Sequence, residues 1–133
     1  MATIFTKIVN GEIPSYKIAE DDNYYAFLDI NPLALGHTLV ITKKETDYIL
    51  NIEDDELAGL IKFAKKVGLA LEKVVECKRI GLTVIGLEVP HAHIHLIPIN
   101  SLYDMDFKQP KLSFSDEKNS ELTKRIQEAY KSL

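Results

Sequence analysis

The chain has 133 residues, of which 46% are hydrophobic and 27% charged, so its composition is that of a folded globular protein and not of a disordered one. This length predicts a single domain that spans residues 1–133. The formal net charge is -4 and no basic stripe runs through the sequence, which argues against binding to a nucleic acid polymer.

The opening MATIFTKIVNGEIPS lacks the basic start and apolar core of a secretory signal, and no apolar run reaches the length of a membrane span. We therefore expect a cytoplasmic protein without a membrane partner. Residues 4–8 predict a short apolar turn, and the segment NGEIPS that follows contains turn formers and a proline.

Two strands are predicted next. Residues 24–32, YYAFLDINP, and residues 36–42, GHTLVIT, are rich in aromatic and β-branched side chains, with NPLALG as their connection.

One long helix is predicted after these strands. Asn51 is its candidate N-cap, and the acidic residues 53–56 lie where the helix dipole favours anions. Apolar side chains then recur at three- and four-residue spacing: Leu57, Leu60, Ile61, Ala64, Val67, Leu71, Val74 and Val75. The single cysteine, Cys77, excludes an intramolecular disulfide bond and is expected to be a partly buried thiol at the end of this helix.

The last predicted elements are two strands and a helix. RIGLTVI, residues 79–85, and HAHIHLIP, residues 91–98, predict the strands. A polar loop is expected over 100–115, followed by an amphipathic helix over about 115–132 with Ser115 or Ser120 as its candidate N-cap. Because regular βαβ alternation is missing, the pattern favours an α+β fold: an antiparallel sheet of about five strands, one long helix and a C-terminal helix.

Three of the four histidines occupy alternate positions of one predicted strand: His91, His93 and His95. Alternate strand residues project from the same face, so the three imidazoles should line one surface while the apolar residues between them face the core. A merely solvated face would not need them, because neighbouring protonated imidazoles repel each other. We therefore interpret this strand as part of a functional site.

Two chemistries fit such a strand. A histidine pair could hold a metal ion with His37 as a third ligand, although the outer two triad positions lie about 13 Å apart, at roughly 3.3 Å per residue, so at most two triad histidines would converge. Alternatively, a neutral imidazole could attack phosphorus and later be released by water, while a neighbouring imidazolium protonates the leaving group.

The stretch GLEVPHAHIHLIP resembles the signature of the histidine-triad (HIT) family, in its Hint-like nucleotide-binding branch. TIFTKIVNGEIPSYKIAEDD and YYAFLDINPLALGHTLVITKKE resemble the family's opening and first strands, so the resemblance runs from about Thr3 to Asn100. It implies a HIT-like fold and a phosphoramidase-like hydrolase, which cleaves a nucleoside 5'-monophosphate from a small leaving group of the phosphoramidate or acyl-adenylate type. It also implies a homodimer, and no cofactor.

The resemblance implies roles for all four histidines. His93 would be the nucleophile that forms a covalent nucleotidyl intermediate at the α-phosphorus. His91 and His95 would orient it and contact phosphate oxygens. His37 would help to organise the same site.

The nucleotide is implied to contact four other residues. Asp29 resembles the acid that accepts hydrogen bonds from both ribose hydroxyls, a role that suits the two oxygens of a carboxylate. Phe5, Ile8 and Phe27 resemble the apolar walls around the base, where a flat aromatic ring is buried. The expected partner is therefore a purine nucleotide or a nucleotide conjugate.

Several positions depart from the family pattern. Many relatives carry a CxxC motif in the opening and a histidine after the KK pair, which together serve structural zinc, whereas this chain has Thr3, Thr6 and Glu45. We therefore expect no metal. Leu87 replaces a glutamine, and the segment 79–88 is shorter than the matching family loop, which affects the expected preference for leaving groups. Asn100 lies beyond the triad, so the asparagine expected before that loop has no counterpart.

The sequence is also compatible with other functions. Within the family, the alternatives are hydrolysis of dinucleoside polyphosphates and nucleotidyl transfer. Outside it, the fold could serve as a noncatalytic nucleotide sensor or scaffold, or the histidines could belong to a metal-dependent hydrolase, whose activity chelation should abolish.

Overall fold

Five strands of the computed structural model, which describes residues 2–133, form one antiparallel sheet in the order β1-β2-β3-β5-β4. The strands are β1 (Lys17–Glu20), β2 (Tyr24–Leu28), β3 (Thr38–Thr42), β4 (Arg79–Thr83) and β5 (His93–Ile99). The expected α+β fold, with about five antiparallel strands, one long helix and a C-terminal helix, is confirmed.

All four predicted strands are present, but each is shorter than the stretch of sequence that predicts it. In particular, β5 begins at His93, so His91 lies just before the strand and not within it. β1 is not among the predicted strands, because its four residues KIAE include only two apolar side chains and carry no readable periodicity.

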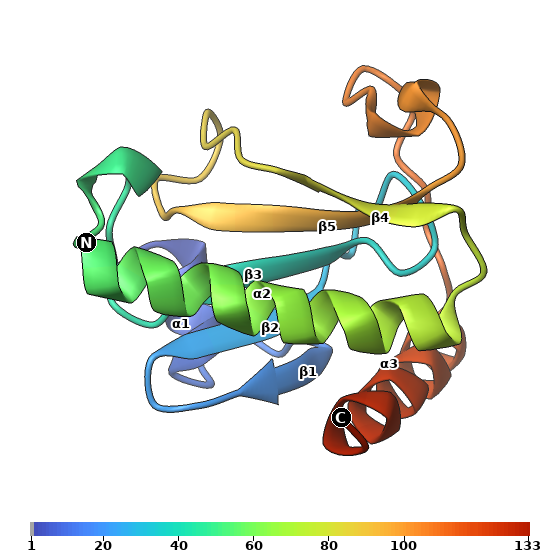
Figure 1. Ribbon diagram of the computed structural model, residues 1–133, viewed down its shortest axis with the longest axis horizontal. Helices are drawn as coiled ribbons and strands as arrows, with labels where there is room; N and C mark the ends of the chain where they lie inside the picture. Colours follow the sequence, from blue (N-terminus) through green and yellow to red (C-terminus); the bar gives the residue numbers. More distant parts are fainter. Residues whose placement is uncertain (1) are drawn as a thin grey trace.

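The described residues also form three α-helices and two short 3₁₀ helices. Figure 1 shows how they surround the sheet. They are α1 (Ile4–Val9), η1 (Ile49–Asn51), α2 (Asp54–Val74), η2 (Leu102–Met105) and α3 (Asp116–Lys131). No helix of residues 2–133 has both the length and the apolar character needed to cross a membrane.

The helix ends agree with the sequence in two cases of three. Asn51 is not the cap of α2, because it ends η1; the N-cap is Glu53, which makes no side-chain cap hydrogen bond. Cys77 is half-buried just beyond the end of α2, as expected. The hydroxyl of Ser115 caps α3 by accepting from the Lys118 amide at 3.1 Å.

The two faces of the sheet pack against different helices. α2 and α3 cover one face, where Ala26, Val40 and Ile94 lie in the larger core. α1 lies on the other face, and its Phe5 and Ile8 pack against residues of β2 and β3 (Figure 1). His93 and His95 pair with Ile41 and Leu39, which puts both rings on the α1 face.

Candidate active site

A cavity of about 510 Å³ opens on the α1 face of the sheet, a volume suited to a small ligand. One part of its wall is apolar and comes from α1, β2 and β3. The other part is polar and comes from the ends of β2, β3 and β5 and from the segment after η2. Predicted site residues that line the cavity are Phe5, Ile8, Phe27, Asp29, His37, His93 and His95.

His93 and His95 are neighbours in the polar wall, with ring centroids 4.9 Å apart. His93 Nδ1 lies 2.7 Å from the backbone carbonyl of His91. Since a carbonyl oxygen can only accept, Nδ1 carries the proton of the neutral ring. Nε2 of His93 therefore keeps its lone pair, as a nucleophile requires.

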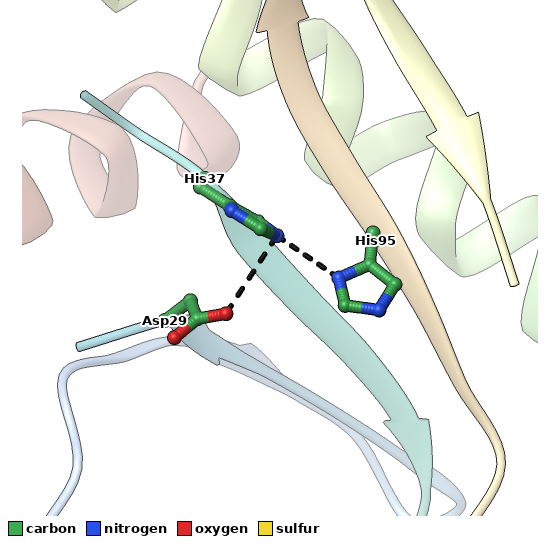
Figure 2. Close-up of side chains that lie close together, drawn as sticks. All are labelled: Asp29, His37 and His95. Carbon is green, nitrogen blue, oxygen red and sulfur yellow. Dashed lines mark hydrogen bonds and ion pairs between the residues drawn. The ribbon is translucent and has the colours of Figure 1, made fainter. Parts of the chain in front are cut away.

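His95 has the opposite protonation, and the reason begins at Leu33. The Leu33 amide donates to His37 Nδ1 at 3.0 Å, so the proton of a neutral His37 is on Nε2. His37 Nε2 then donates to His95 Nδ1 at 2.9 Å (Figure 2). This leaves the proton of His95 on Nε2, where it can be donated to an anionic ligand.

Both rings of this pair are neutral at pH 7. Burial, helped by the positive charge of Lys111, lowers the pKa of His37 to about 4. Burial and the adjacent His37 lower the pKa of His95 to about 3. The hydrogen bond between the two rings is therefore one between neutral imidazoles.

His91 has a different environment from the other two triad members. Its side chain is fully buried and is not part of the cavity wall. Its Nε2 donates to the Thr42 carbonyl at 2.7 Å, and its Nδ1 lies 2.9 Å from the hydroxyl of Thr3. Since both ring nitrogens already have protein partners, the implied contact of His91 with phosphate does not fit this geometry.

The nucleotide-binding candidates lie together along the cavity. Asp29 follows β2 with its side chain 21% exposed; one oxygen accepts from the Asn31 amide at 2.9 Å, and the other lies 3.7 Å from His37 Nε2 (Figure 2). Phe5 and Phe27 meet edge to face with ring centroids 5.5 Å apart, and Ile8 lines the same apolar wall. Aromatic and carboxylate groups are thus combined in one pocket.

Residues 10–102 match the HIT domain model. The chain belongs to the histidine-triad family. An uncharacterized HIT-like protein of Borreliella burgdorferi is 41% identical over 131 residues, covering 92% of this chain and 94% of that protein. The adenosine 5'-monophosphoramidase hnt1 of Schizosaccharomyces pombe is 35% identical over 129 residues, covering 95% and 96% of the two chains.

Solved structures agree with this membership. The crystal structure of a hypothetical histidine triad nucleotide-binding protein from Sulfolobus tokodaii superposes with a TM-score of 0.83 at 33% identity, covering 97% of this chain and 92% of that one.

Among the described residues, one group of this HIT protein has metal-ligand spacing: atoms of Asp29, His37 and His95 lie within 4.8 Å of one another (Figure 2). This group differs from the ligand set that the sequence suggests, which combines His37 with two histidines of the triad strand. A metal at this point would have to replace the proton on His37 Nε2. Because the Leu33 amide points at Nδ1 of the same ring, that proton cannot move to Nδ1, and the donor set does not fit a metal ion.

Phe107 and Lys111 are among the residues of the cavity wall that were not predicted. The Phe107 ring meets His95 edge to face with centroids 4.8 Å apart, and Lys111 Nζ donates to the Phe107 carbonyl at 2.8 Å. Both belong to the segment 100–115, which lacks periodicity, and both lie beyond the residues that match the HIT domain, so no sequence signal singles them out. Leu87, the departure from glutamine, is 89% exposed at the cavity wall.

Proposed function

We propose that this HIT protein hydrolyses the bond between a purine nucleoside 5'-monophosphate and a small leaving group, of the phosphoramidate or acyl-adenylate type, through a nucleotidyl-His93 intermediate. The observation that supports it best is that two neighbouring imidazoles have different Nδ1 partners, the His91 carbonyl for His93 and the His37 ring for His95. These partners leave a lone pair on His93 Nε2 beside an N–H on His95 Nε2. Kinship with adenosine 5'-monophosphoramidases supports the substrate class.

In the first step, the lone pair of His93 Nε2 attacks the α-phosphorus while the bond to the leaving group breaks. The bonding electrons go to the leaving group, which takes a proton from solvent. His93 becomes a phosphorylated imidazolium, and its Nδ1–H remains hydrogen-bonded to the His91 carbonyl. His95 donates its Nε2–H to a phosphate oxygen and keeps the proton, because a ring with a pKa of about 3 is not an imidazolium acid at neutral pH.

In the second step, water attacks phosphorus and the bond between phosphorus and Nε2 breaks. The electron pair returns to His93, the water proton goes to solvent, and the nucleoside monophosphate leaves. The Asp29 carboxylate accepts from the ribose hydroxyls, and the base lies against Phe5, Ile8 and Phe27.

Intact mass spectrometry tests the intermediate. The chain and a His95→Gln variant are mixed with adenosine 5'-phosphoramidate and quenched, and a nucleotide-sized adduct is expected on both. His93→Ala should form no adduct and lose turnover while still binding AMP. Full turnover by His93→Ala would exclude His93 as the nucleophile.

Three further measurements separate the alternatives. Turnover of the phosphoramidate and of a dinucleoside polyphosphate, measured side by side, ranks the two substrate classes. Nucleotide binding without turnover by the wild-type chain would favour a sensor. Loss of activity with EDTA would favour a metal-dependent hydrolase, whereas the histidine mechanism should survive chelation.

The sheet edge at β4 suits the expected homodimer of a cytoplasmic enzyme. β4 has one neighbour in the sheet, and a hollow between α2 and β4 is lined by the exposed apolar side chains of Ile61, Leu69 and Leu82. Two such edges could pair across a twofold axis. Light scattering should give twice the mass of one chain, and Leu82→Glu should give monomers.

A further inference from the structure

A polar cluster lies at the Nδ1 side of the His91 ring, outside the cavity wall. It combines Thr3, which precedes α1, with Thr6 of α1 and Glu45 of the segment after β3. One carboxylate oxygen of Glu45 accepts from the Thr3 amide at 2.7 Å and from the Thr6 hydroxyl at 2.6 Å. We call these three residues the threonine clamp.

The hydrogen-bond directions in the cluster follow from the groups that can only accept. His91 Nε2 keeps its proton and donates it in a hydrogen bond to the Thr42 carbonyl, so Nδ1 of the neutral ring must accept. Two hydroxyls are near it, Thr3 at 2.9 Å and Thr6 at 3.4 Å. Because the Thr6 proton goes to Glu45, the Thr3 hydroxyl is the donor to His91.

Two further features of the clamp are the ionised carboxylate of Glu45 and the role of Thr3 as a helix cap. The two hydrogen bonds from Thr3 and Thr6 lower the pKa of Glu45, which keeps the carboxylate ionised at neutral pH. The Thr3 hydroxyl accepts from the Thr6 amide at 3.1 Å, so the atom that holds His91 is at the same time the N-cap of α1.

His91 links the clamp to the reacting atom. Its buried ring is held at both nitrogens, and its own carbonyl accepts from His93 Nδ1 at 2.7 Å. A released ring would let this carbonyl shift, and His93 could then place its proton on Nε2 and lose the lone pair that attacks phosphorus.

We infer that Glu45, Thr6 and Thr3 are positioning residues that hold the nucleophile in its reactive tautomer by acting through His91. This inference rests on the proposed role of His93. It adds a supporting contact to His91 from residues at the start of α1 and in the segment after β3.

The test compares Thr3→Val, which removes the donor at nearly constant volume, with Thr123→Val. Thr123 is a buried threonine of α3 whose hydroxyl donates only to the Asn119 carbonyl, so it controls for the loss of a buried hydroxyl. Thr3→Val should lower kcat about ten- to a hundredfold, since small displacements of reacting groups have effects of this order. The Kd for AMP should change less than about twofold, because the clamp does not line the cavity.

Nitrogen-15 NMR of the histidine rings reads the tautomer directly, without turnover. In the wild type, His93 should show a protonated Nδ1 and a free Nε2, whereas Thr3→Val should show a mixture. Thr3→Ser should restore both kcat and the wild-type spectrum. Glu45→Gln keeps the accepting oxygen, so its kcat and its His93 spectrum should be close to those of the wild type.

An unchanged His93 tautomer in Thr3→Val, with a kcat equal to that of Thr123→Val, would overturn the inference. If Thr3→Val does not fold, Glu45→Ala takes its place, because loss of an exposed carboxylate should leave the fold intact. The His93 tautomer and the kcat of that variant then decide in the same way. Should His93→Ala retain full turnover, the proposed function fails, while the NMR comparison still tests whether the clamp sets the tautomer.

Discussion

Two histidines of one strand differ in the candidate site because their Nδ1 atoms meet different partners. His93 Nδ1 meets a carbonyl oxygen, and His95 Nδ1 meets an N–H of His37. The nitrogen on the far side of each ring is therefore a lone pair in one case and a donor in the other. Alternation along a strand predicts that these rings share a face, but it carries no information on tautomers, which depend on Leu33 and on the turn at His91.

Lys111 is the one lysine or arginine among the described residues that line the cavity. An anionic nucleotide should therefore bind less well to Lys111→Ala. The side chain is exposed, so we expect kcat/KM to fall about two- to fivefold, the effect of a surface ion pair, and less at high salt.

Steady-state kinetics at low and high ionic strength checks the Lys111 prediction. Lys108→Ala is the matched control, since Lys108 is exposed on the same segment but outside the cavity wall. Equal losses in the two variants would mean that only the general charge of this segment matters.

At the scale of elements, the sequence predicts those parts of the fold that have a strong local signal. The long helix and four strands follow from periodicity, and Ser115 follows from capping chemistry. β1 is too short for a pattern, and Asn51 fails as a cap because it ends η1, two residues before the Glu53 N-cap of α2. The segment 100–115 contributes to the site through long-range packing alone, which no local propensity encodes.

The approach of α2 to β2 depends on Gly59. A Cβ at this position would lie 2.8 Å from Cζ of Tyr24 and closer still to its hydroxyl, which donates to the Glu56 carbonyl at 2.8 Å. Gly59→Ala should therefore destabilise the protein by about 2 kcal/mol through overpacking, although alanine is the better helix former.

Urea unfolding of Gly59→Ala, Tyr24→Phe and the double variant checks this contact. Because removal of the hydroxyl relieves part of the clash, the double variant should be more stable than the sum of the single changes implies. Strict additivity would show that α2 shifts as a whole and that Tyr24 does not limit its approach.

At the scale of the whole molecule, the site makes stability depend on pH, because folding buries neutral imidazoles that are free to take protons in the unfolded chain. The folded pKa values are about 4 for His37 and about 3 for His95, below the ordinary value of 6.5. Between these limits the unfolded state binds more protons, so the free energy of unfolding falls as the pH falls. From pH 7.5 to 5 we expect a loss of about 2 kcal/mol for each of the two histidines.

Urea unfolding at several pH values from 7.5 to 5 measures this loss above the range in which carboxylates titrate. Burial lowers the pKa of three rings, His37, His91 and His95, and His95→Gln removes one of them, so its free energy of unfolding should depend less steeply on pH than that of the wild type. A wild-type free energy that stays constant over this range would mean that the rings take up protons as readily in the folded protein as in the unfolded chain. At pH 7 about a quarter of such rings would be protonated, so the neutral hydrogen bond between His37 and His95, on which the donor role of His95 depends, would form in only part of the molecules.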